Sequence, residues 1–225
     1  MGAMPITGIF EQHDGFFELP HVDLKSFPNE EIPIAKHWPY IKIFRYNIIK
    51  QPDTLNMFYF FGKEFSHREK LVNYEYYEER TLHESSLSPA VHGLLAIELG
   101  KLEDGYEFTE YASRLDLDNY NRNTEQGLHV SAASGAWAVM LHGWAGMRID
   151  GDMLEFNPTI WKNWNSYTVR VAYNGVLIEL HVTKSSAKIK VIKGEKTVQV
   201  RIYQEEYMLS KNGIEVDLLE YWKKN

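Results

Sequence analysis

Cysteine is absent from the 225 residues of this chain. A protein without thiols has no disulfide, no thiolate metal site and no cysteine nucleophile. Basic residues are not in excess either, because the net charge is −7 at pH 7. A nucleic-acid partner is bound by Lys and Arg side chains that neutralise a row of phosphates. We therefore expect no nucleic-acid partner.

Long apolar runs are also missing. A membrane-spanning helix needs about 20 consecutive, mainly apolar residues, and no stretch of this sequence has that character. The opening residues, MGAMPITGIFEQHDGFF, have neither the basic leader nor the apolar core of a signal peptide. Together with the lack of cysteine, these features predict a cytoplasmic protein that does not associate with membranes.

The motifs that mark many cofactor enzymes do not occur. None of the nine histidines belongs to a His-Glu-x-x-His zinc motif. The sequence has no Gly-x-Ser-x-Gly nucleophile elbow, no phosphate-binding Gly-x-x-x-x-Gly-Lys loop and no dinucleotide fingerprint. We expect neither a metal site nor a cofactor.

Aromatic residues, in contrast, are plentiful. The chain has 14 Tyr, 11 Phe and 6 Trp. Such rings supply core volume, and Tyr and Trp also form flat, amphipathic walls that suit sugars. Composition alone leaves both interpretations open.

The first 146 residues have the pattern of a helical domain. Five prolines before residue 50 predict an irregular start. Helices are then predicted from Pro52, from Ser66 with Glu69 at capping-box spacing, and from Ser88-Pro89 up to a stop at Gly100. Two more are predicted over 103–115 and about 131–145. The last is rich in Ala and Gly, which lets neighbouring helices approach closely.

From Met147 the apolar residues recur with period two, which is typical of strands. Asn174-Gly175 is a strong hairpin signal. We expect a second hairpin around 193–195 and a third at Asn212-Gly213. The sequence thus predicts an α+β protein, with a helical domain at 1–146 and an antiparallel β-domain at 147–225.

Polar clusters lie at the predicted helix ends. Ser85 and Ser86 precede a helix N-terminus, where hydroxyls and free N–H groups either bind an anion or simply cap the helix. His129, in a Gly-Leu-His turn before the next small-residue helix, is either a donor to the same anion or a structural histidine.

Three further residues allow two interpretations each. Glu78 follows the aromatic run Tyr74–Tyr77 and is either a sugar-binding carboxylate or the frayed end of a helix. Lys50 and Gln51 offer donors and an amide of the kind that bind glucose hydroxyls, or they are solvated residues before a helix. The residues alone do not decide.

Six stretches, in order and covering nearly all of residues 8–183, resemble the maltose, kojibiose, nigerose and trehalose phosphorylases of glycoside hydrolase family 65. They are Phe-Glu-Gln-His-Asp-Gly-Phe-Phe at 10–17, Ile-Lys-Gln-Pro-Asp at 49–53, Tyr-Tyr-Glu-Glu-Arg-Thr-Leu-His-Glu-Ser-Ser-Leu-Ser-Pro at 76–89, Arg-Leu-Asp-Leu-Asp-Asn at 114–119, Gly-Leu-His-Val-Ser at 127–131, and Gly-Met-Arg through Leu-Glu-Phe-Asn-Pro at 146–158.

The resemblance implies the C-terminal part of an (α/α)6 barrel followed by a small antiparallel β-sandwich. It assigns glucose contacts to Lys50, Gln51 and Glu78. It also assigns inorganic phosphate to Ser85, Ser86 and His129. In this family phosphate attacks the anomeric carbon of an α-glucoside disaccharide and inverts it to β-glucose 1-phosphate, while a carboxylic acid protonates the leaving oxygen.

The resemblance places that general acid roughly a hundred residues before the Lys-Gln pair, where this chain has no matching residue. We therefore expect no catalytic residue and no turnover by the chain alone. The alternatives are a non-catalytic carbohydrate-binding or oligomerisation module, and a remnant of a hydrolase with Glu84 or Glu78 as its base. A partial barrel also exposes apolar surface, which predicts self-association or association with the missing N-terminal part.

Overall fold

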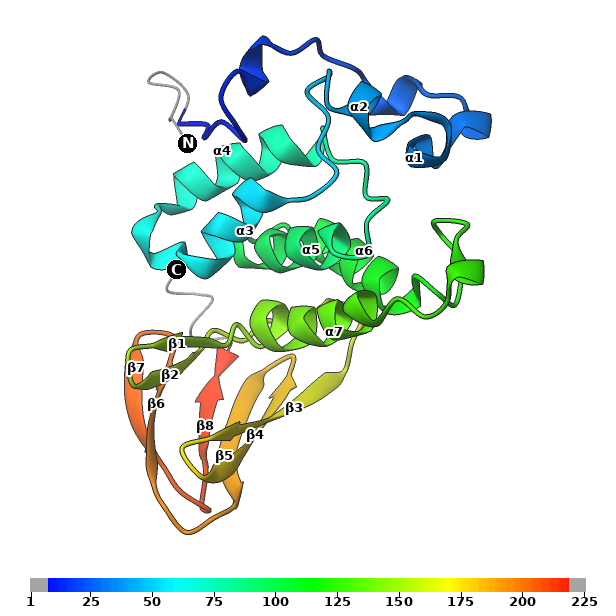
Figure 1. Cartoon of the computed structure of the whole chain (residues 1–225). Coiled ribbons are helices and arrows are strands. Elements are labelled where there is room, and N and C mark those ends of the chain that lie inside the picture. Colours follow the sequence, from blue (N-terminus) through cyan, green and yellow to red (C-terminus); the bar gives the residue numbers. More distant parts are fainter. Residues whose placement is uncertain (1–7, 219–225) are drawn as a thin grey trace. The chain divides into compact units, whose positions relative to one another are not determined.

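The computed structural model describes residues 8–218. The chain splits into two compact units, of which the first ends at Val139 and the second begins at Met140. The first is helical and the second is built from strands, as Figure 1 shows. The predicted α+β class is confirmed at this level.

The first unit consists of seven helices in the part of the chain that the structure describes, with short 3₁₀ turns between them. The helices are α1 (Ile34–His37), α2 (Tyr40–Ile43), α3 (Asp53–Phe60), α4 (His67–Glu78), α5 (Ser88–Glu98), α6 (Leu102–Arg114) and α7 (Val130–Ala138). Between residues 8 and 50 the helical elements are 3₁₀ turns and the two four-residue helices, because prolines interrupt this segment. The predicted irregular start is thus confirmed.

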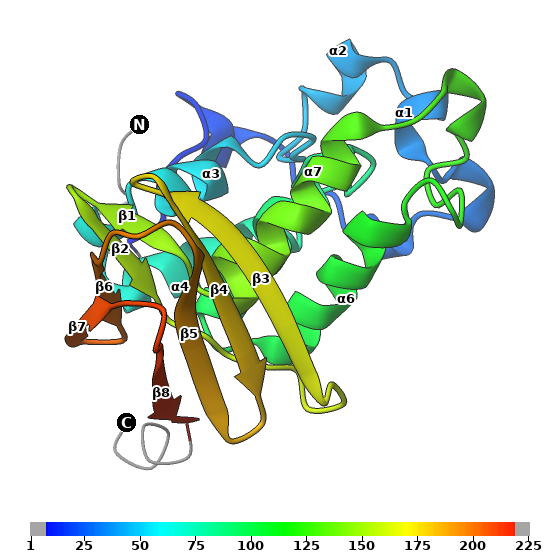
Figure 2. The ribbon, with the colours of Figure 1, turned by 90° about the horizontal axis from the view of Figure 1, so that it is seen from below.

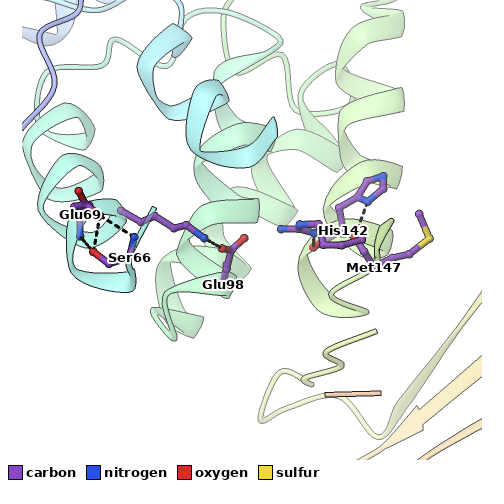
Figure 3. Close-up of polar contacts among 7 residues, drawn as sticks. Ser66, Glu69, Glu98, His142 and Met147 are labelled. Carbon is purple, nitrogen blue, oxygen red and sulfur yellow. Dashed lines mark hydrogen bonds and ion pairs between the residues drawn. The ribbon is translucent and has the colours of Figure 1, made fainter. Parts of the chain in front are cut away.

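Helix α4 begins where its capping box predicts. The Ser66 hydroxyl accepts the Glu69 N–H at 3.2 Å, and a Glu69 carboxylate oxygen accepts the Ser66 N–H at 2.8 Å, as seen in Figure 3. These reciprocal bonds satisfy two N–H groups that a helix start leaves without partners. Helix α5 likewise begins at Ser88, and the chain turns at Gly100 with φ +77°.

Helices α5 and α6 pack closely through a glycine from each. A Cβ on Gly93 would lie 2.9 Å from the Phe108 Cβ, and a Cβ on Gly105 would lie 2.5 Å from the Ile97 Cγ1. The two helices therefore approach more closely than any larger residue at these positions would allow. The core of this unit lies around α3, α4 and α5 and consists of Phe16, Ile49, Leu55, Phe58, Tyr74, Tyr77, Leu95, Ala96 and Leu99.

As far as the chain is described, to residue 218, the second unit holds two four-stranded sheets. The strands are β1 (Arg148–Asp150), β2 (Met153–Phe156), β3 (Ser166–Tyr173), β4 (Val176–Thr183), β5 (Ser186–Lys193), β6 (Val198–Ile202), β7 (Glu205–Leu209) and β8 (Ile214–Asp217). One sheet has the order β1-β2-β6-β7 and the other the order β3-β4-β5-β8, and Figure 2 shows β3, β4 and β5 side by side.

A π-helical turn over Val139–Trp144 precedes the strands. His142 Nδ1 lies 3.1 Å from the Met147 carbonyl oxygen, a contact drawn in Figure 3. Gly146 between them has φ +60°, and a Cβ there would lie 2.4 Å from the Asn157 carbonyl oxygen. Both the backbone conformation and the space therefore require glycine at this position.

The first predicted hairpin is confirmed. Tyr173 of β3 pairs with Val176 of β4, and the two turn residues, Asn174 and Gly175, have φ values of +48° and +82°. Two consecutive positive φ values are those of a type I′ turn, whose twist matches that of the strands it connects.

The second and third predicted hairpins are wrong. Strand β5 pairs with β4 and β8, whereas β6 pairs with β2 and β7, so the turn around 193–195 carries the chain from one sheet to the other. Asn212-Gly213 likewise joins β7 and β8, which belong to different sheets. Turn residues alone do not distinguish a hairpin from such a crossover. Pairing is decided by the burial of one apolar face of each strand in a common core.

That core contains residues from both sheets, including Leu154, Phe156, Ile178, Leu180 and Val200. The predicted purely antiparallel arrangement needs one correction, because β2 and β6 run parallel. The segment between them forms β3, β4 and β5 of the other sheet. This segment is long enough for the chain to return and to begin β6 in the same direction as β2. No helix among residues 8–218 is both long and apolar enough to cross a membrane.

Candidate functional site

A short parallel bridge holds Lys50 and Gln51 beside the segment that follows α4. The Ile49 N–H donates to the Arg80 carbonyl at 2.7 Å, and the Leu82 N–H donates to the Ile49 carbonyl at 2.9 Å. Backbone hydrogen bonds thus set the two segments side by side. Gln51 consequently lies within reach of the serines that begin a few residues later.

Ser85 is buried, and its hydroxyl bonds on two sides. It donates to Gln51 Oε1 at 3.1 Å and accepts the Leu87 N–H at 3.2 Å. Helix α5 has Leu87 at its N-cap, and the Leu87 side chain makes no cap hydrogen bond. Ser85 therefore bonds the backbone at the start of α5, as the capping interpretation predicts, and also contacts Gln51. The structure brings together one predicted glucose residue and one predicted phosphate residue.

Ser86 connects the start of α5 to the start of α7. Its hydroxyl lies 3.4 Å from the Ser131 hydroxyl, in the first turn of α7. The two helices approach closely, since a Cβ on Gly135 would lie 2.7 Å from the Ala90 Cβ, as the Ala- and Gly-rich sequence predicts. Two helix N-termini, each with N–H groups and a positive dipole end, thus converge at these hydroxyls. Such an arrangement favours an anion.

His129 is the N-cap residue of α7, and Asp116 holds it at two points. The imidazole Nδ1 lies 2.5 Å from Asp116 Oδ1, and the His129 N–H donates to Asp116 Oδ2 at 2.8 Å. These hydrogen bonds, the side-chain one first, lower the pKa of Asp116. Sequence reasoning gave Asp116 no role, because nothing in its pattern shows that it meets a residue 13 positions later.

Glu78 is the last residue of α4 and lies next to His83. Its Oε1 is 3.7 Å from His83 Nε2, and this imidazole is the main cause of a lowered Glu78 pKa. His83 has φ +52°, a left-handed conformation that is uncommon for a residue with a side chain. Within the part of the chain that the structure describes, Glu78 makes no hydrogen bond to Gln51 or to the serines.

Lys50 contacts the side chain of Tyr40. Its Nζ donates to the Tyr40 hydroxyl and lies 3.9 Å from the centre of that ring. The structure therefore links Gln51 with Ser85, and Ser86 with the start of α7. It leaves Lys50 and Glu78 with partners that the sequence analysis did not name.

Glu84 has a structural contact that bears on the hydrolase alternative. Its two carboxylate oxygens accept the N–H groups of Ile34 and Ala35, at 2.5 and 2.8 Å, at the start of α1. A general base needs a carboxylate oxygen directed at a water molecule beside the sugar. Both Glu84 oxygens are instead engaged by backbone donors, which disfavours it as the base.

A buried histidine was missed by sequence reasoning. His92 of α5 is fully buried, and neither of its ring nitrogens has a hydrogen-bond partner among residues 8–218. Its ring lies against His83 at 4.5 Å and Phe108 at 5.4 Å between centroids. Burial and the neighbouring His83 lower the His92 pKa well below 6.5, so the ring is neutral. No group of three or more potential metal ligands occurs within the described residues.

Comparisons with known proteins agree with this arrangement. Residues 4–138 match the model of the glycosyl hydrolase family 65 central catalytic domain, and residues 147–209 match that of the family's C-terminal domain. A maltose phosphorylase from Bacillus subtilis is 39% identical over 201 residues, covering 89% of this chain. An α,α-trehalose phosphorylase from Thermoanaerobacter brockii is 34% identical over 206 residues, covering 92% of this chain.

A solved structure described as "Putative kojibiose phosphorylase from human microbiome" superposes with a TM-score of 0.87 at 41% identity. It covers 95% of this chain and 28% of its own length. The chain likewise spans only 26% of the length of the maltose and trehalose phosphorylases. With both domain models matched in order, the chain belongs to glycosyl hydrolase family 65.

Proposed function

We propose that this chain carries part of the glucose and phosphate site of an inverting α-glucoside phosphorylase. The observation that supports this most is the hydrogen bond between Gln51 and Ser85, beside two converging helix N-termini. In this proposal Lys50, Gln51 and Glu78 bind glucose. Ser85, Ser86 and His129 bind phosphate. The relatives named as maltose, trehalose and kojibiose phosphorylases support phosphate, rather than water, as the nucleophile.

The proposed reaction needs no cofactor. A phosphate oxygen forms a bond to the anomeric carbon as the glycosidic C–O bond breaks, and the leaving oxygen takes a proton from a carboxylic acid. Convergent hydroxyls, an imidazole and helix N-termini would hold the phosphate oxygens in line for attack. The products are β-glucose 1-phosphate and the released sugar.

We further propose that the chain alone binds these ligands without turnover. Glu11, Asp14 and Glu18 do not match the family's acid motif, and Glu11 Oε1 already accepts the Phe17 N–H at 3.3 Å. General acid assistance contributes about 10²–10⁴-fold. Formation of glucose 1-phosphate should be assayed with maltose, kojibiose, nigerose and trehalose, each with phosphate. Robust turnover by this chain would contradict the proposal.

Binding is tested separately by calorimetric titration with glucose and with inorganic phosphate. Heat from both ligands, lost for phosphate in His129→Ala, is the expected result. The absence of binding to either ligand would reject the site and leave an inert fragment.

A carbohydrate-binding or oligomerisation module is the second candidate. A shallow recess in the second unit favours the first of these roles, because it places the half-buried Trp164 between Asn163 and Asn165, next to Tyr167. An aromatic face flanked by amides is suited to a sugar ring. Maltose binding that survives Gln51→Ala but not Trp164→Ala would favour this module over the phosphorylase site.

A further inference from the structure

Asp116 and His129 form a two-point contact that the proposed phosphate site does not by itself explain. Asp116 lies in the loop after α6, and helix α6 runs beside α7 in Figure 2. One carboxylate oxygen contacts the His129 ring at Nδ1, and the other accepts the backbone N–H of the same residue. Ring and backbone are therefore fixed together, at the first turn of α7.

This contact determines which ring nitrogen remains available. An ionised carboxylate only accepts hydrogen bonds, so the 2.5 Å contact places a proton on Nδ1 of His129. Nε2 is then the nitrogen left for a ligand. It donates its proton to a phosphate oxygen when the ring is cationic, and it accepts a phosphate O–H when the ring is neutral.

Two other carboxylates of this loop, those of Asp118 and Glu125, pair with basic side chains away from His129. Arg114 pairs with Asp118 through contacts of 2.6 and 2.7 Å, and Glu125 lies 3.8 Å from Lys36. The hydrogen bonds that lower the pKa of Asp116 come from His129 alone. Across the helix start, the groups in contact are the hydroxyls of Ser86 and Ser131, which carry no charge. The carboxylate is thus dedicated to one imidazole.

We propose that Asp116 is a positioning residue, which fixes the His129 ring with its proton on Nδ1 and so presents Nε2 to phosphate. The inference rests on the proposed function, because it gives His129 the phosphate role. Asp116 acts through His129 and does not itself contact phosphate, whose charge it would repel.

The test compares Asp116→Asn with Asp118→Asn in the 225-residue chain, after circular dichroism has shown that both variants are folded. Asp118 is the matched control, because it lies in the same loop and bonds Arg114 instead of His129. Nitrogen NMR of ring-labelled histidine reports which ring nitrogen carries the proton. Calorimetry with inorganic phosphate reports affinity.

We expect His129 in the unchanged chain to give the signal of a protonated Nδ1. Asp116→Asn should mix the two tautomers and weaken phosphate binding about tenfold, as expected for loss of a charge-assisted hydrogen bond. Asp118→Asn should change neither. An Asp116→Asn variant with the same ring signal and the same affinity as the unchanged chain would overturn the inference.

The two proposals fail in different ways. If the unchanged chain does not bind phosphate, or His129→Ala binds it equally well, the proposed phosphate site is wrong. The ring signal still decides whether Asp116 fixes the tautomer. If phosphate binding depends on His129 but the ring signal is unchanged in Asp116→Asn, the site stands and the positioning role fails.

Discussion

The hydroxyl of Ser85 donates to Gln51 Oε1 across 3.1 Å, although the two residues are 34 positions apart. Gln51 is the proposed glucose contact and Ser85 the proposed phosphate contact. A residue from each subsite thus shares one hydrogen bond. Glucose and phosphate must lie next to each other for the proposed bond to form between them, and this pair brings their binding residues into direct contact.

The Ser85–Gln51 bond should give measurable coupling in a double-mutant cycle. We expect Ser85→Ala and Gln51→Ala to lower the free energy of unfolding in urea by less in combination than the sum of the two single changes. Contacting residues couple by about 0.5–3 kcal/mol. The control cycle combines Gln51→Ala with Ser86→Ala, and the two changes in free energy are expected to be additive there. Additivity in both cycles would show that the bond contributes nothing.

Glu78 should bind glucose as a carboxylate. Its pKa lies below the ordinary value of 4.5, chiefly through His83, so the carboxylate is ionised at neutral pH. We expect Glu78→Gln to weaken glucose binding about tenfold in calorimetry at pH 7, because a charge-assisted hydrogen bond is lost. Glu79→Gln, the exposed neighbour, is the control. Equal affinities for both variants would remove Glu78 from the site.

His92 should make the stability of the fold depend on pH. Its pKa in the folded chain is well below the 6.5 of an exposed histidine, so between these two values only the unfolded chain binds the extra proton. The stability contributed by neutral His92 is fully present above pH 6.5 and is lost as the pH falls toward the lower pKa. Urea unfolding between pH 5 and pH 8 measures this loss.

Replacement by an aromatic residue that does not titrate isolates the effect. His92→Phe keeps a ring against His83 and Phe108, so its stability should fall less between pH 6.5 and pH 5 than that of the unchanged chain. His37→Phe replaces an exposed histidine of the same unit and serves as the control. Identical profiles for the chain and His92→Phe would contradict the prediction.

Gly105→Ala should destabilise the helical unit. Alanine gains about 1 kcal/mol in helix propensity, but its Cβ would meet Ile97, and such overpacking costs about 1–3 kcal/mol. We expect a net loss of about 1 kcal/mol in urea unfolding. Ile97→Ala removes the obstructing atom, so the double variant should lose less than the sum of the two. The exposed Ser113→Ala serves as the control.

Self-association is expected from the apolar side chains on the surface of the helical unit. Leu128 and Val130 are 74% and 68% exposed, and they flank the proposed phosphate residue His129. Sedimentation velocity should detect dimers of this chain at tens of micromolar, reduced in Leu128→Ser/Val130→Ser. A single monomeric species at all concentrations would rule out a second copy as the occupant of this surface.

Local patterns predicted the elements well. Ser66 and Glu69 mark the start of α4 because both capping bonds form within one turn, and Asn174-Gly175 closes its hairpin because both residues tolerate positive φ. The wrong hairpins concern the turns from β5 to β6 and from β7 to β8, each of which joins strands of different sheets. A turn fixes only the direction of the chain, whereas the shared core fixes the pairing.

The site was predictable in part. The resemblance picked out Gln51 and Ser85, and the structure joins them. It also picked out Glu78 and His129, but not the residues that hold them, His83 and Asp116. Such partners are specified by the distances between side chains in the folded chain. A single sequence does not encode those distances in any local spacing.

The bridge between Ile49 and Thr81 has a consequence for motion. The Ile49 N–H bonds the Arg80 carbonyl and the Leu82 N–H bonds the Ile49 carbonyl, so these bonds join the segment before Gln51 to the segment before Ser85. In amide hydrogen exchange these two positions should open with one rate, as a single cooperative unit. Glucose or phosphate, added alone, should slow amide exchange at both positions. Occupation of either subsite would then reduce the backbone opening beside the other.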